Sequence, residues 1–458
     1  MNYVSTRGGI APIPFRQAVM MGLARDGGLL LPERYPDIRD RLADWADLPY
    51  PDLAFEIIRL FADDIPADAL RDIVRRSYAV FTHPEITPVR PLGRVWLLEL
   101  FHGPTLAFKD VALQFLGNLF EYLLGDSGDE LNVVVATSGD TGSAAIHGIR
   151  GRKRQRIFVL HPHGRVSPVQ EAQMTSVPDA NVFNLAVEST FDDCQSIVKT
   201  LFRDLPFKDA HHLGAVNSIN WARVLAQVVY YVHSALRVMR ETGAAKVRFA
   251  VPTGNFGDIF AGYVAARMGL PVDKLVLATN ENDILSRYFA SGVYARGAVA
   301  QTLSPSMDIQ VASNFERYLF ERAGRDPATV RGWMDAFARD GRLDLSALPP
   351  DPLFAAGAGT TDDTLAAIRD TYAATGTVID PHTAVGVSVA LRNLAADAPT
   401  ICLATAHPAK FPAAVARALG RDGLATHPEV ERVLALPRRC VTMPNDAAAV
   451  AAYVSENT

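Results

Sequence analysis

A single lysine inside an apolar segment is the first residue whose type suggests chemistry. Lys109 follows Phe108 in the stretch FHGPTLAFKDVALQF, residues 101 to 115. The chain has seven lysines and 38 arginines, so arginine is its usual residue wherever only a positive charge is needed. A desolvated lysine can lose its proton and attack a carbonyl, whereas a guanidinium stays charged. Lys109 is therefore a candidate nucleophile; the simpler alternative is a helix-start lysine that extends into solvent.

Two loops, each between an apolar run and a helical pattern, carry residues suited to anions. The first is TSGDTG, residues 137 to 142, and the second is TGNFGD, residues 253 to 258. Small residues at a helix start expose backbone N–H groups at its positive end, where phosphate or carboxylate groups bind. An ordinary capped turn would explain either loop taken alone. Neither the Walker lysine nor the G-x-G-x-x-G spacing is present, so nucleotide-triphosphatase and dinucleotide-binding functions are not favoured.

A third cluster of donors lies in the stretch VNSINWAR. Asn217, Ser218, Asn220 and Arg223 are crowded together at a predicted helix start. Their donors could hold a second anion, with Arg223 supplying the charge. The alternative is a capped helix followed by an arginine that faces solvent.

These candidates lie on alternating strands and helices, which predict parallel sheets with helices on their faces. Residues 1 to 85 are expected to be mainly helical, with one helix that begins after Pro14 and ends at Gly27 and Gly28. The stretch after residue 415 is expected to form a helix, a turn and a tail. Strands are predicted at 131–136, 156–160, 181–187, 246–251, 274–280 and 400–406, and helices at 110–124, 219–239, 257–269, 313–323 and 328–340.

Composition limits the function classes. The chain has 458 residues, of which 49% are hydrophobic and 21% charged, which allows two or three domains with ample cores. A net charge of −5 argues against nucleic acid as a partner. Three distant cysteines fit neither a disulfide framework nor a zinc site, so no metal is expected and a reducing cytoplasm is favoured. No signal pattern or membrane-length apolar run is seen, so we expect a soluble protein without a membrane partner.

Five motifs are similar, in their order along the chain, to those of threonine synthases. They are FHGPTLAFKD, ATSGDTG, VNSINWAR, PTGNFGD and TAHPAKF, and STRGG and GLARDGGLLLPE resemble the family's N-terminal segment. The resemblance covers about residues 3 to 415. It implies a pyridoxal 5′-phosphate enzyme with the α/β fold shared by tryptophan synthase β-subunit and cysteine synthase (fold type II).

The expected architecture follows from that resemblance. Two parallel-sheet αβα domains would be joined to an N-terminal mainly helical segment. The expected divisions are an N-terminal helical domain over 1–85, a smaller α/β domain with the cofactor lysine and substrate loops over 86–235, and a larger α/β domain with the cofactor phosphate loop over 236–458.

The resemblance also implies residue roles. Lys109 would form the Schiff base with the cofactor, and Thr405 would meet the pyridine nitrogen. Enzymes of the wider fold often have Asn where Asp140 stands, so the protonation state of Asp140 beside the cofactor hydroxyl is open. His407 and Lys410 have either a direct role or a place in a loop at the sheet rim. Gly254, Asn255, Phe256, Gly257 and Asp258 would bind the cofactor phosphate region; Ser138, Asp140 and Thr141 would border the substrate carboxylate and the ring; and Asn217, Ser218, Asn220 and Arg223 would hold the substrate phosphate.

The implied reaction converts O-phospho-L-homoserine and water to L-threonine and phosphate by β,γ-elimination and water addition, the last step of threonine biosynthesis. This is carbon–oxygen lyase chemistry, expected of a monomer or homodimer. A related phospho-lyase stays open. A serine/threonine dehydratase is disfavoured because serine has no phosphate for the Arg223 cluster, and a non-catalytic relative is disfavoured because Lys109 is present.

Overall fold

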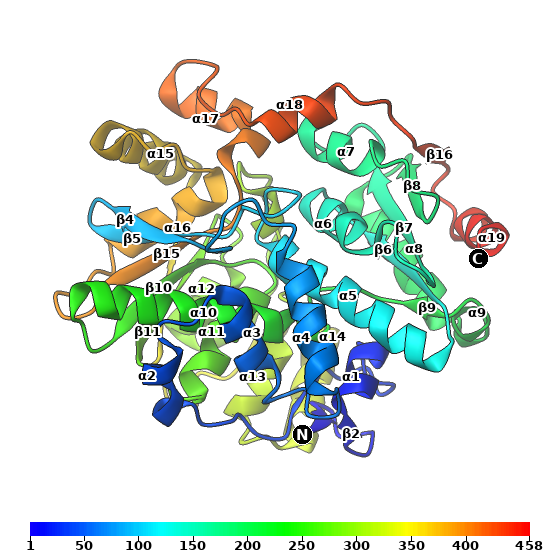
Figure 1. Cartoon of the computed structure of the whole chain (residues 1–458), viewed down its shortest axis with the longest axis horizontal. Helices are drawn as coiled ribbons and strands as arrows, with labels where there is room; N and C mark the ends of the chain where they lie inside the picture. The colour runs from blue at the N-terminus through cyan, green and yellow to red at the C-terminus, as the bar shows by residue number, and fades with distance from the viewer.

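Two helix-covered sheets form the body of the protein in a computed structural model that describes residues 1–458 (Figure 1). The larger sheet lies on the left of Figure 1 and the smaller on the right. The larger has six strands in the order β14 (Phe354–Ala358), β11 (Val272–Thr279), β10 (Val247–Pro252), β15 (Thr400–Ala404), β5 (Val95–Glu99) and β4 (Val89–Leu92). The smaller has five, in the order β16 (Val441–Met443), β8 (Val182–Val187), β7 (Gln155–Pro162), β6 (Leu131–Ala136) and β9 (Leu213–Gly214).

Almost every strand pair in these two sheets is parallel, as the alternating sequence pattern predicts. The exception is β4 with β5, which pair antiparallel. Successive side chains of a strand face opposite layers: Phe249 and Val251 of β10 belong to one hydrophobic cluster, and Ala250 belongs to another on the opposite face. The parallel α/β fold with helices on the sheet faces is therefore confirmed.

Nineteen α-helices and two small antiparallel sheets complete the fold. None of the helices combines the length and apolar character that a membrane span requires. The helices are α1 Phe15–Met21, α2 Leu42–Trp45, α3 Tyr50–Ile58, α4 Ala67–Tyr78, α5 Lys109–Ser127, α6 Asp140–Ile149, α7 Pro168–Thr175, α8 Phe191–Arg203, α9 Leu205–Ala210, α10 Trp221–Thr242, α11 Gly257–Arg267, α12 Ile284–Ser291, α13 Phe315–Arg322, α14 Pro327–Asp340, α15 Thr361–Thr375, α16 Pro381–Leu391, α17 Pro412–Leu419, α18 Pro428–Leu434 and α19 Ala447–Glu456. The small sheets are β2 (Ile13–Pro14), β1 (Asn2–Ser5) and β3 (Leu30–Pro32), and β12 (Val293–Ala295) with β13 (Arg342–Asp344).

The two large sheets are not built from two continuous stretches of chain. β4 and β5 precede Lys109 but belong to the larger sheet, because β5 pairs with β15. Near the other end, β16 pairs with β8 of the smaller sheet. Figure 1 shows this C-terminal stretch crossing the top of the molecule from α17 through α18 to α19. The expected divisions at residues 86 and 236 therefore do not coincide with the division between the sheets.

The predicted strands form β6, β7, β8, β10, β11 and β15, and the predicted helices form α5, α10, α11, α13 and α14. The mainly helical character of residues 1–85 is confirmed, whereas two expectations about the bounds of elements were wrong. The helix after Pro14 ends at Met21 rather than at Gly27, because Gly22 takes φ 64° and its N–H donates to the carbonyl of Ala18. The C-terminal stretch forms α17, α18, β16 and α19 rather than a helix, a turn and a tail. Residues 1–85 also contain the small β2-β1-β3 sheet beside their helices.

The N-terminal segment braces the body of the protein. The side-chain amide of Asn220 donates to the carbonyl of Val19 over 2.9 Å, and Nε of Arg317 donates to the carbonyl of Leu30 over 3.0 Å. These contacts tie the first 85 residues to the N-cap of α10 and to α13 itself. The N-terminal segment therefore fixes the start of α10, which carries Arg223.

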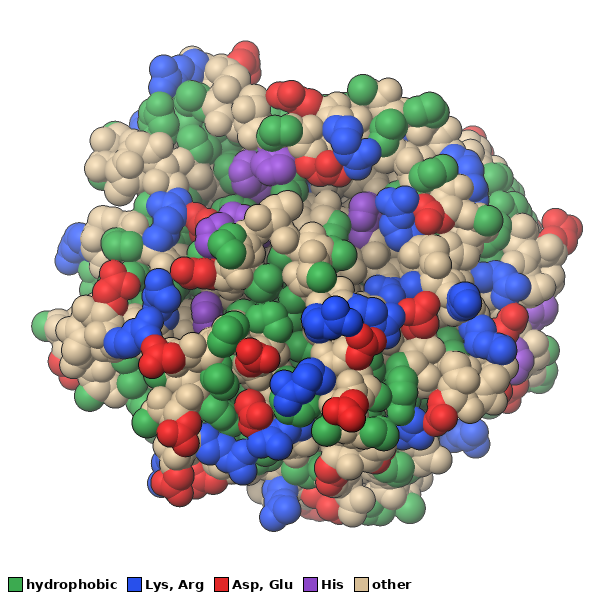
Figure 2. Space-filling model, viewed as in Figure 1, with side chains coloured by type: hydrophobic (Ala, Val, Ile, Leu, Met, Phe, Trp, Pro, Cys, Tyr) green, Lys and Arg blue, Asp and Glu red, His purple; other side chains and the backbone are tan.

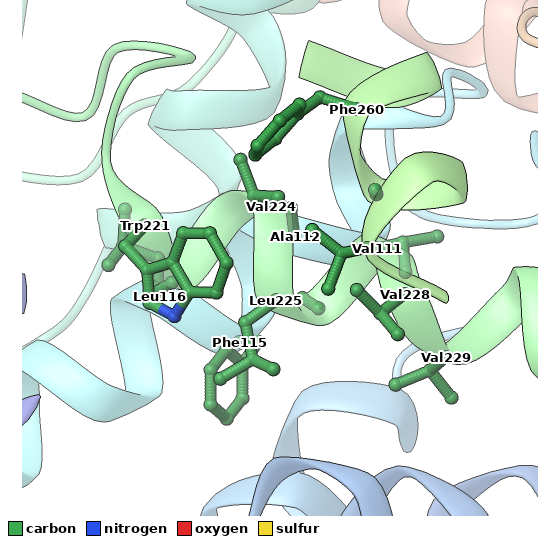
Figure 3. Close-up of a cluster of buried hydrophobic side chains, with 14 of the residues drawn as sticks. Val111, Ala112, Phe115, Leu116, Trp221, Val224, Leu225, Val228, Val229 and Phe260 are labelled. Carbon is green, nitrogen blue, oxygen red and sulfur yellow. The ribbon is translucent and has the colours of Figure 1, made fainter. Parts of the chain in front are cut away.

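One hydrophobic cluster fixes α5, α10 and α11 against one another (Figure 3). Full burial of an aliphatic or aromatic side chain stabilises a fold by about 1.5–3 kcal/mol relative to exposure. The buried side chains of this cluster therefore set the positions of all three helix starts. Its labelled members are Val111, Ala112, Phe115 and Leu116 of α5, Trp221, Val224, Leu225, Val228 and Val229 of α10, and Phe260 of α11.

Candidate active site

Lys109 is the first residue of α5, and its side chain is only 10% exposed. Phe108 donates its backbone N–H to the carbonyl of Thr405 over 2.8 Å, which ties the helix start to the end of β15. Burial lowers the pKa of Lys109; Asp140 opposes this effect, and the neighbouring Lys410 and Arg223 add to it. A lysine that extends into solvent does not fit this position, whereas a desolvated nucleophile does.

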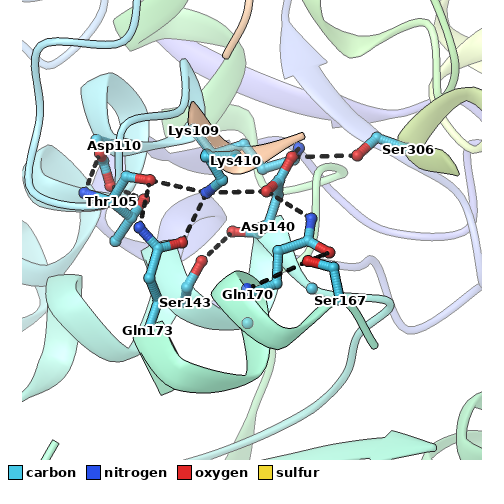
Figure 4. Close-up of polar contacts among 12 residues, drawn as sticks. Thr105, Lys109, Asp110, Asp140, Ser143, Ser167, Gln170, Gln173, Ser306 and Lys410 are labelled. Atoms are coloured by element: carbon cyan, nitrogen blue, oxygen red, sulfur yellow. Dashed lines mark hydrogen bonds and ion pairs between the residues drawn. The ribbon is translucent and has the colours of Figure 1, made fainter. Parts of the chain in front are cut away.

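Asp140, the first residue of α6, faces Lys109 (Figure 4). Its Oδ2 lies 3.6 Å from Nζ of Lys109 and accepts from the hydroxyl of Ser306 over 3.2 Å. Its Oδ1 lies 2.9 Å from Nζ of Lys410 and accepts from Nε2 of Gln170, also over 2.9 Å. Burial alone would raise the pKa of Asp140, but the ammonium groups of Lys410 and Lys109 hold it well below its usual range. Asp140 is therefore a carboxylate.

Lys410 belongs to this cluster and not to an exposed rim. Its side chain is fully buried, and its Nζ donates to the carbonyl of Thr105 over 2.7 Å and to Oε1 of Gln173 over 2.9 Å. Together with Asp140 these acceptors match the three donors of an ammonium group.

His407 occupies a different environment. Its Nδ1 accepts from the N–H of Ala409, and its ring lies 4.8 Å from that of His427. Both rings, with His102, line a cavity of about 280 Å³. Histidine side chains gather in the upper left of the face shown in Figure 2. His407 thus joins the Lys410 turn through its backbone, and its side chain makes no hydrogen bond or ion pair with Lys109 or Asp140.

The TSGDTG loop leaves two hydroxyl groups free. Oγ1 of Thr137 accepts from the N–H groups of Gly139 and Gly142, each over 2.9 Å, so Thr137 caps the turn. Gly139 has φ 142°, and a Cβ there would lie 2.4 Å from the side chain of Gln170. The side chains of Ser138 and Thr141 are half-buried and make no hydrogen bond within the chain.

The TGNFGD loop has the form of an anion cradle. The backbone N–H groups of Gly254, Asn255 and Phe256 donate to no acceptor in the chain. Phe256 has φ 64° and leads into α11 at Gly257, whose first-turn N–H groups also point outward from the helix. A Cβ on Gly254 would lie 2.8 Å from the carbonyl oxygen of Ser306, so only glycine fits there.

The side chain of Asp258 does not face this cradle. Its Oδ1 accepts from the hydroxyls of Tyr230 and Tyr231 over 2.6 and 2.9 Å, and burial raises the pKa of Asp258 to about 6. Its Oδ2 is buried without a hydrogen-bond partner, and Oδ1 joins α11 to α10, so the backbone N–H is the part of Asp258 that the loop offers to an anion.

Arg223 is buried, with 4% of the residue exposed, and so does not face solvent. No carboxylate lies within ion-pair distance, Nη1 donates to the carbonyl of Val216 over 3.0 Å, and Nε has no partner. Burial lowers the pKa of Arg223 to about 10. A buried guanidinium without a counter-ion is expensive unless an anion binds beside it.

The other residues of this cluster differ in their freedom to bind a ligand. Asn220 caps α10 through its Oδ1, which accepts from Ala222, and its amide is committed to the N-terminal segment. The hydroxyl of Ser218 lies 3.1 Å from that of Ser313. Asn217 is half-buried, and its side chain makes no hydrogen bond within the chain.

Two residues that no motif contains join these loops. Asn314 donates to the hydroxyl of Ser218 and to the carbonyl of Asn255, and Ser306 touches both Asp140 and Gly254. The starts of α5, α6, α10 and α11 therefore meet at one place, where their positive ends favour anions. For four residues the sequence gives no sign of a place at the site, because nothing in their local pattern marks them: Gln170, Gln173, Ser306 and Asn314.

The residues present fit pyridoxal phosphate. A buried amine with a lowered pKa suits an aldehyde, and backbone N–H groups without acceptors suit a phosphate. Thr405, buried at the end of β15, offers a hydroxyl that makes no hydrogen bond within the chain. The uncompensated Arg223 is left for a second anion.

Comparisons with known proteins show the family to which the chain belongs. Residues 2–78 match the family model described as threonine synthase N terminus, residues 80–346 match pyridoxal-phosphate dependent enzyme, and residues 383–454 match threonine synthase, C-terminal. The chain is 49% identical to the threonine synthase of Schizosaccharomyces pombe over 92% of its own length and 89% of the relative's, and 46% identical to that of Pseudomonas aeruginosa over 100% and 98%.

A solved structure gives the same result. The crystal structure of PLP-bound threonine synthase from Brucella melitensis is similar with a TM-score of 0.95 and 47% identity, covering 100% of this chain and 99% of that one. The chain therefore belongs to the threonine synthase family of pyridoxal-phosphate-dependent enzymes.

Proposed function

We propose that this chain is a threonine synthase that converts O-phospho-L-homoserine and water to L-threonine and phosphate. The observation that carries the proposal is the arrangement of two separate anion sites around one buried amine. The N–H groups of residues 254–256 form one site, the uncompensated guanidinium of Arg223 forms the other, and Lys109 lies buried beside both. A cofactor phosphate and a substrate phosphate need two such sites.

Lys109 is the attachment point for the cofactor aldehyde. Bound pyridoxal phosphate supplies the electron sink for carbanion chemistry at the substrate. The unprotonated amine of Lys109 would take the α-proton of a bound substrate and then move the β-proton. Asp140, with Oδ2 at 3.6 Å, orients that amine.

The other residues bind and orient the two ligands. Arg223, with Ser218 and Asn217, holds the leaving phosphate. The hydroxyl of Thr405 would meet the ring nitrogen of the bound cofactor, and a neutral hydroxyl there would leave that nitrogen unprotonated and so temper carbanion stabilisation. The remaining assignments are Ser138 and Thr141 to the substrate carboxylate, and the backbone of Gly254, Asn255, Phe256, Gly257 and Asp258 to the cofactor phosphate.

Two of the residues expected at the site act as positioning residues. The side chain of Asn220 caps α10 and so fixes the helix turn that carries Arg223. The carboxyl group of Asp258 holds Tyr230 and Tyr231, which lock α11 to α10. Neither side chain touches a ligand in this assignment.

The partners we propose are small molecules only, in a cytoplasmic monomer or homodimer. A net charge of −5 supports this, as does the face shown in Figure 2, where acidic and basic side chains are interspersed. Nucleic-acid binding would instead need a concentrated basic surface.

The test supplies phosphohomoserine and measures phosphate, L-threonine and 2-oxobutyrate together. We expect one threonine for each phosphate released. A phospho-lyase would release phosphate with 2-oxobutyrate, a dehydratase would act on unphosphorylated serine or threonine, and a non-catalytic relative would release nothing. Any of these three results would reject the proposal.

A further inference from the structure

The carboxylate of Asp140 has two ammonium groups within 4 Å, and they differ in role. Lys109 must give up its proton to act on a carbonyl or to take a proton from a substrate. When it does so, Lys410 is the one cation that remains within ion-pair distance of Asp140. A buried carboxylate without a partner would cost several kcal/mol. Lys410 has no exposed surface, so it can act on the reaction only through its neighbours.

The two oxygens of Asp140 have separate partners. Lys410 and Gln170 occupy Oδ1, which leaves Oδ2 for Ser306 and for Lys109 (Figure 4). Lys410 is itself held by the carbonyl of Thr105, whose N–H donates to Asp110. The carboxylate therefore cannot turn without breaking this network, and its Oδ2 stays directed at the amine.

We propose that Lys410 is a positioning residue that fixes Oδ1 of Asp140 and offsets the carboxylate's charge, so that Asp140 orients the Lys109 amine without holding a proton on it. The pair then acts toward Lys109 much as a neutral amide would. The inference rests on the proposed function for the role of Lys109 itself. The positive charge of Lys410 also lowers the pKa of Lys109, which is the direction that the inference requires.

The experiment measures the protonation of Lys109 directly in the full-length chain after cofactor removal. Acetic anhydride labels unprotonated amines, and mass spectrometry of the peptide that contains Lys109 gives its labelling rate across pH. We expect Lys410→Met to slow labelling at about pH 8 roughly tenfold, which corresponds to one pKa unit. Asp140→Asn should label faster than the wild type, because Lys410 then lowers the pKa of Lys109 without opposition from a carboxylate, and Asp140→Asn/Lys410→Met should label at about the wild-type rate.

The matched control is Lys246→Met, which also removes one ammonium group. Lys246 pairs with Asp273 and Asp397, is 39% exposed, and should leave the labelling of Lys109 unchanged. In the cofactor-loaded enzyme, the acidic limb of the kcat profile should move to higher pH in Lys410→Met. A lysine that only supports the fold would not shift that limb.

Equal labelling profiles for the wild type and Lys410→Met would overturn the proposal. If Lys410→Met does not fold, the comparison of Asp140→Asn with the double variant decides, because the proposal requires the double variant to label more slowly. Failure of the proposed function is recognised separately: borohydride reduction would then place the cofactor on a peptide without Lys109.

Discussion

Arg223→Met removes a buried guanidinium that no carboxylate of the chain neutralises. If Arg223 binds the substrate phosphate, the variant loses one or more charge-assisted hydrogen bonds, each worth about 1.5–3 kcal/mol. A loss of that size corresponds to roughly 10- to 150-fold in affinity. We therefore expect the KM for phosphohomoserine to rise by about that factor in an assay of phosphate release, while cofactor absorbance stays as in the wild type.

The same substitution predicts an unusual stability result. An unpaired buried charge destabilises the ligand-free protein, so the Tm of Arg223→Met should be unchanged or higher. Arg317→Met is the matched control, because Arg317 is also fully buried but donates to the carbonyl of Leu30 through two nitrogens, over 3.0 and 2.8 Å. Its loss leaves acceptors unsatisfied and should lower the free energy of unfolding by about 1–3 kcal/mol for each group. An unchanged KM with a Tm loss like that of the control would refute the assignment of Arg223.

Three further variants test neighbouring parts of the site. Gly254→Ala places a Cβ 2.8 Å from the carbonyl oxygen of Ser306. Overpacking of about 1–3 kcal/mol should weaken cofactor binding about tenfold in an absorbance titration. The control Gly332→Ala, whose new Cβ has no atom within 4 Å, should bind the cofactor as the wild type does. Thr405→Asp should retain the cofactor but give less threonine and more keto acid per phosphate, because a carboxylate would hold a proton on the ring nitrogen; an unchanged product ratio places Thr405 away from the ring. Asp258→Asn removes a carboxyl group whose pKa burial raises to about 6. The protonated carboxyl group stabilises the fold fully below its unfolded pKa of about 4, and this contribution is lost as the pH rises through about 6. Relative to the wild type, the variant's free energy of unfolding should therefore rise by up to about 3 kcal/mol between about pH 4 and pH 7. Unfolding curves with the same pH dependence for both proteins would contradict this.

The parts of the site that could be predicted from sequence are those whose chemistry is local. A strand, a loop of small residues and a helix start follow one another along the chain, so the loops before α6 and α11 were recognisable from their own residues. Burial decided the alternatives that the sequence left open. Lys109 and Arg223 could each have faced solvent, and the hydrophobic cluster of α5 and α10 is what places both inside.

The parts that could not be predicted depend on contacts between distant segments. Ser306 and Asn314 reach the site from an irregular stretch, and Gln170 and Gln173 from α7; no spacing or composition marks them. The three-residue strand β16 is too short to stand out and exists only because β8 offers an edge.

Peptide mapping after borohydride reduction identifies the lysine that carries the cofactor. Reduction fixes the cofactor to the lysine that carries it, and two buried lysines lie on either side of Asp140. We expect the adduct on the peptide TLAFKDVALQF, at Lys109. Lys109→Arg should form no adduct and make no threonine, because a guanidinium neither condenses with an aldehyde nor moves a proton. An adduct on Lys410, or threonine formation by Lys109→Arg, would contradict this assignment.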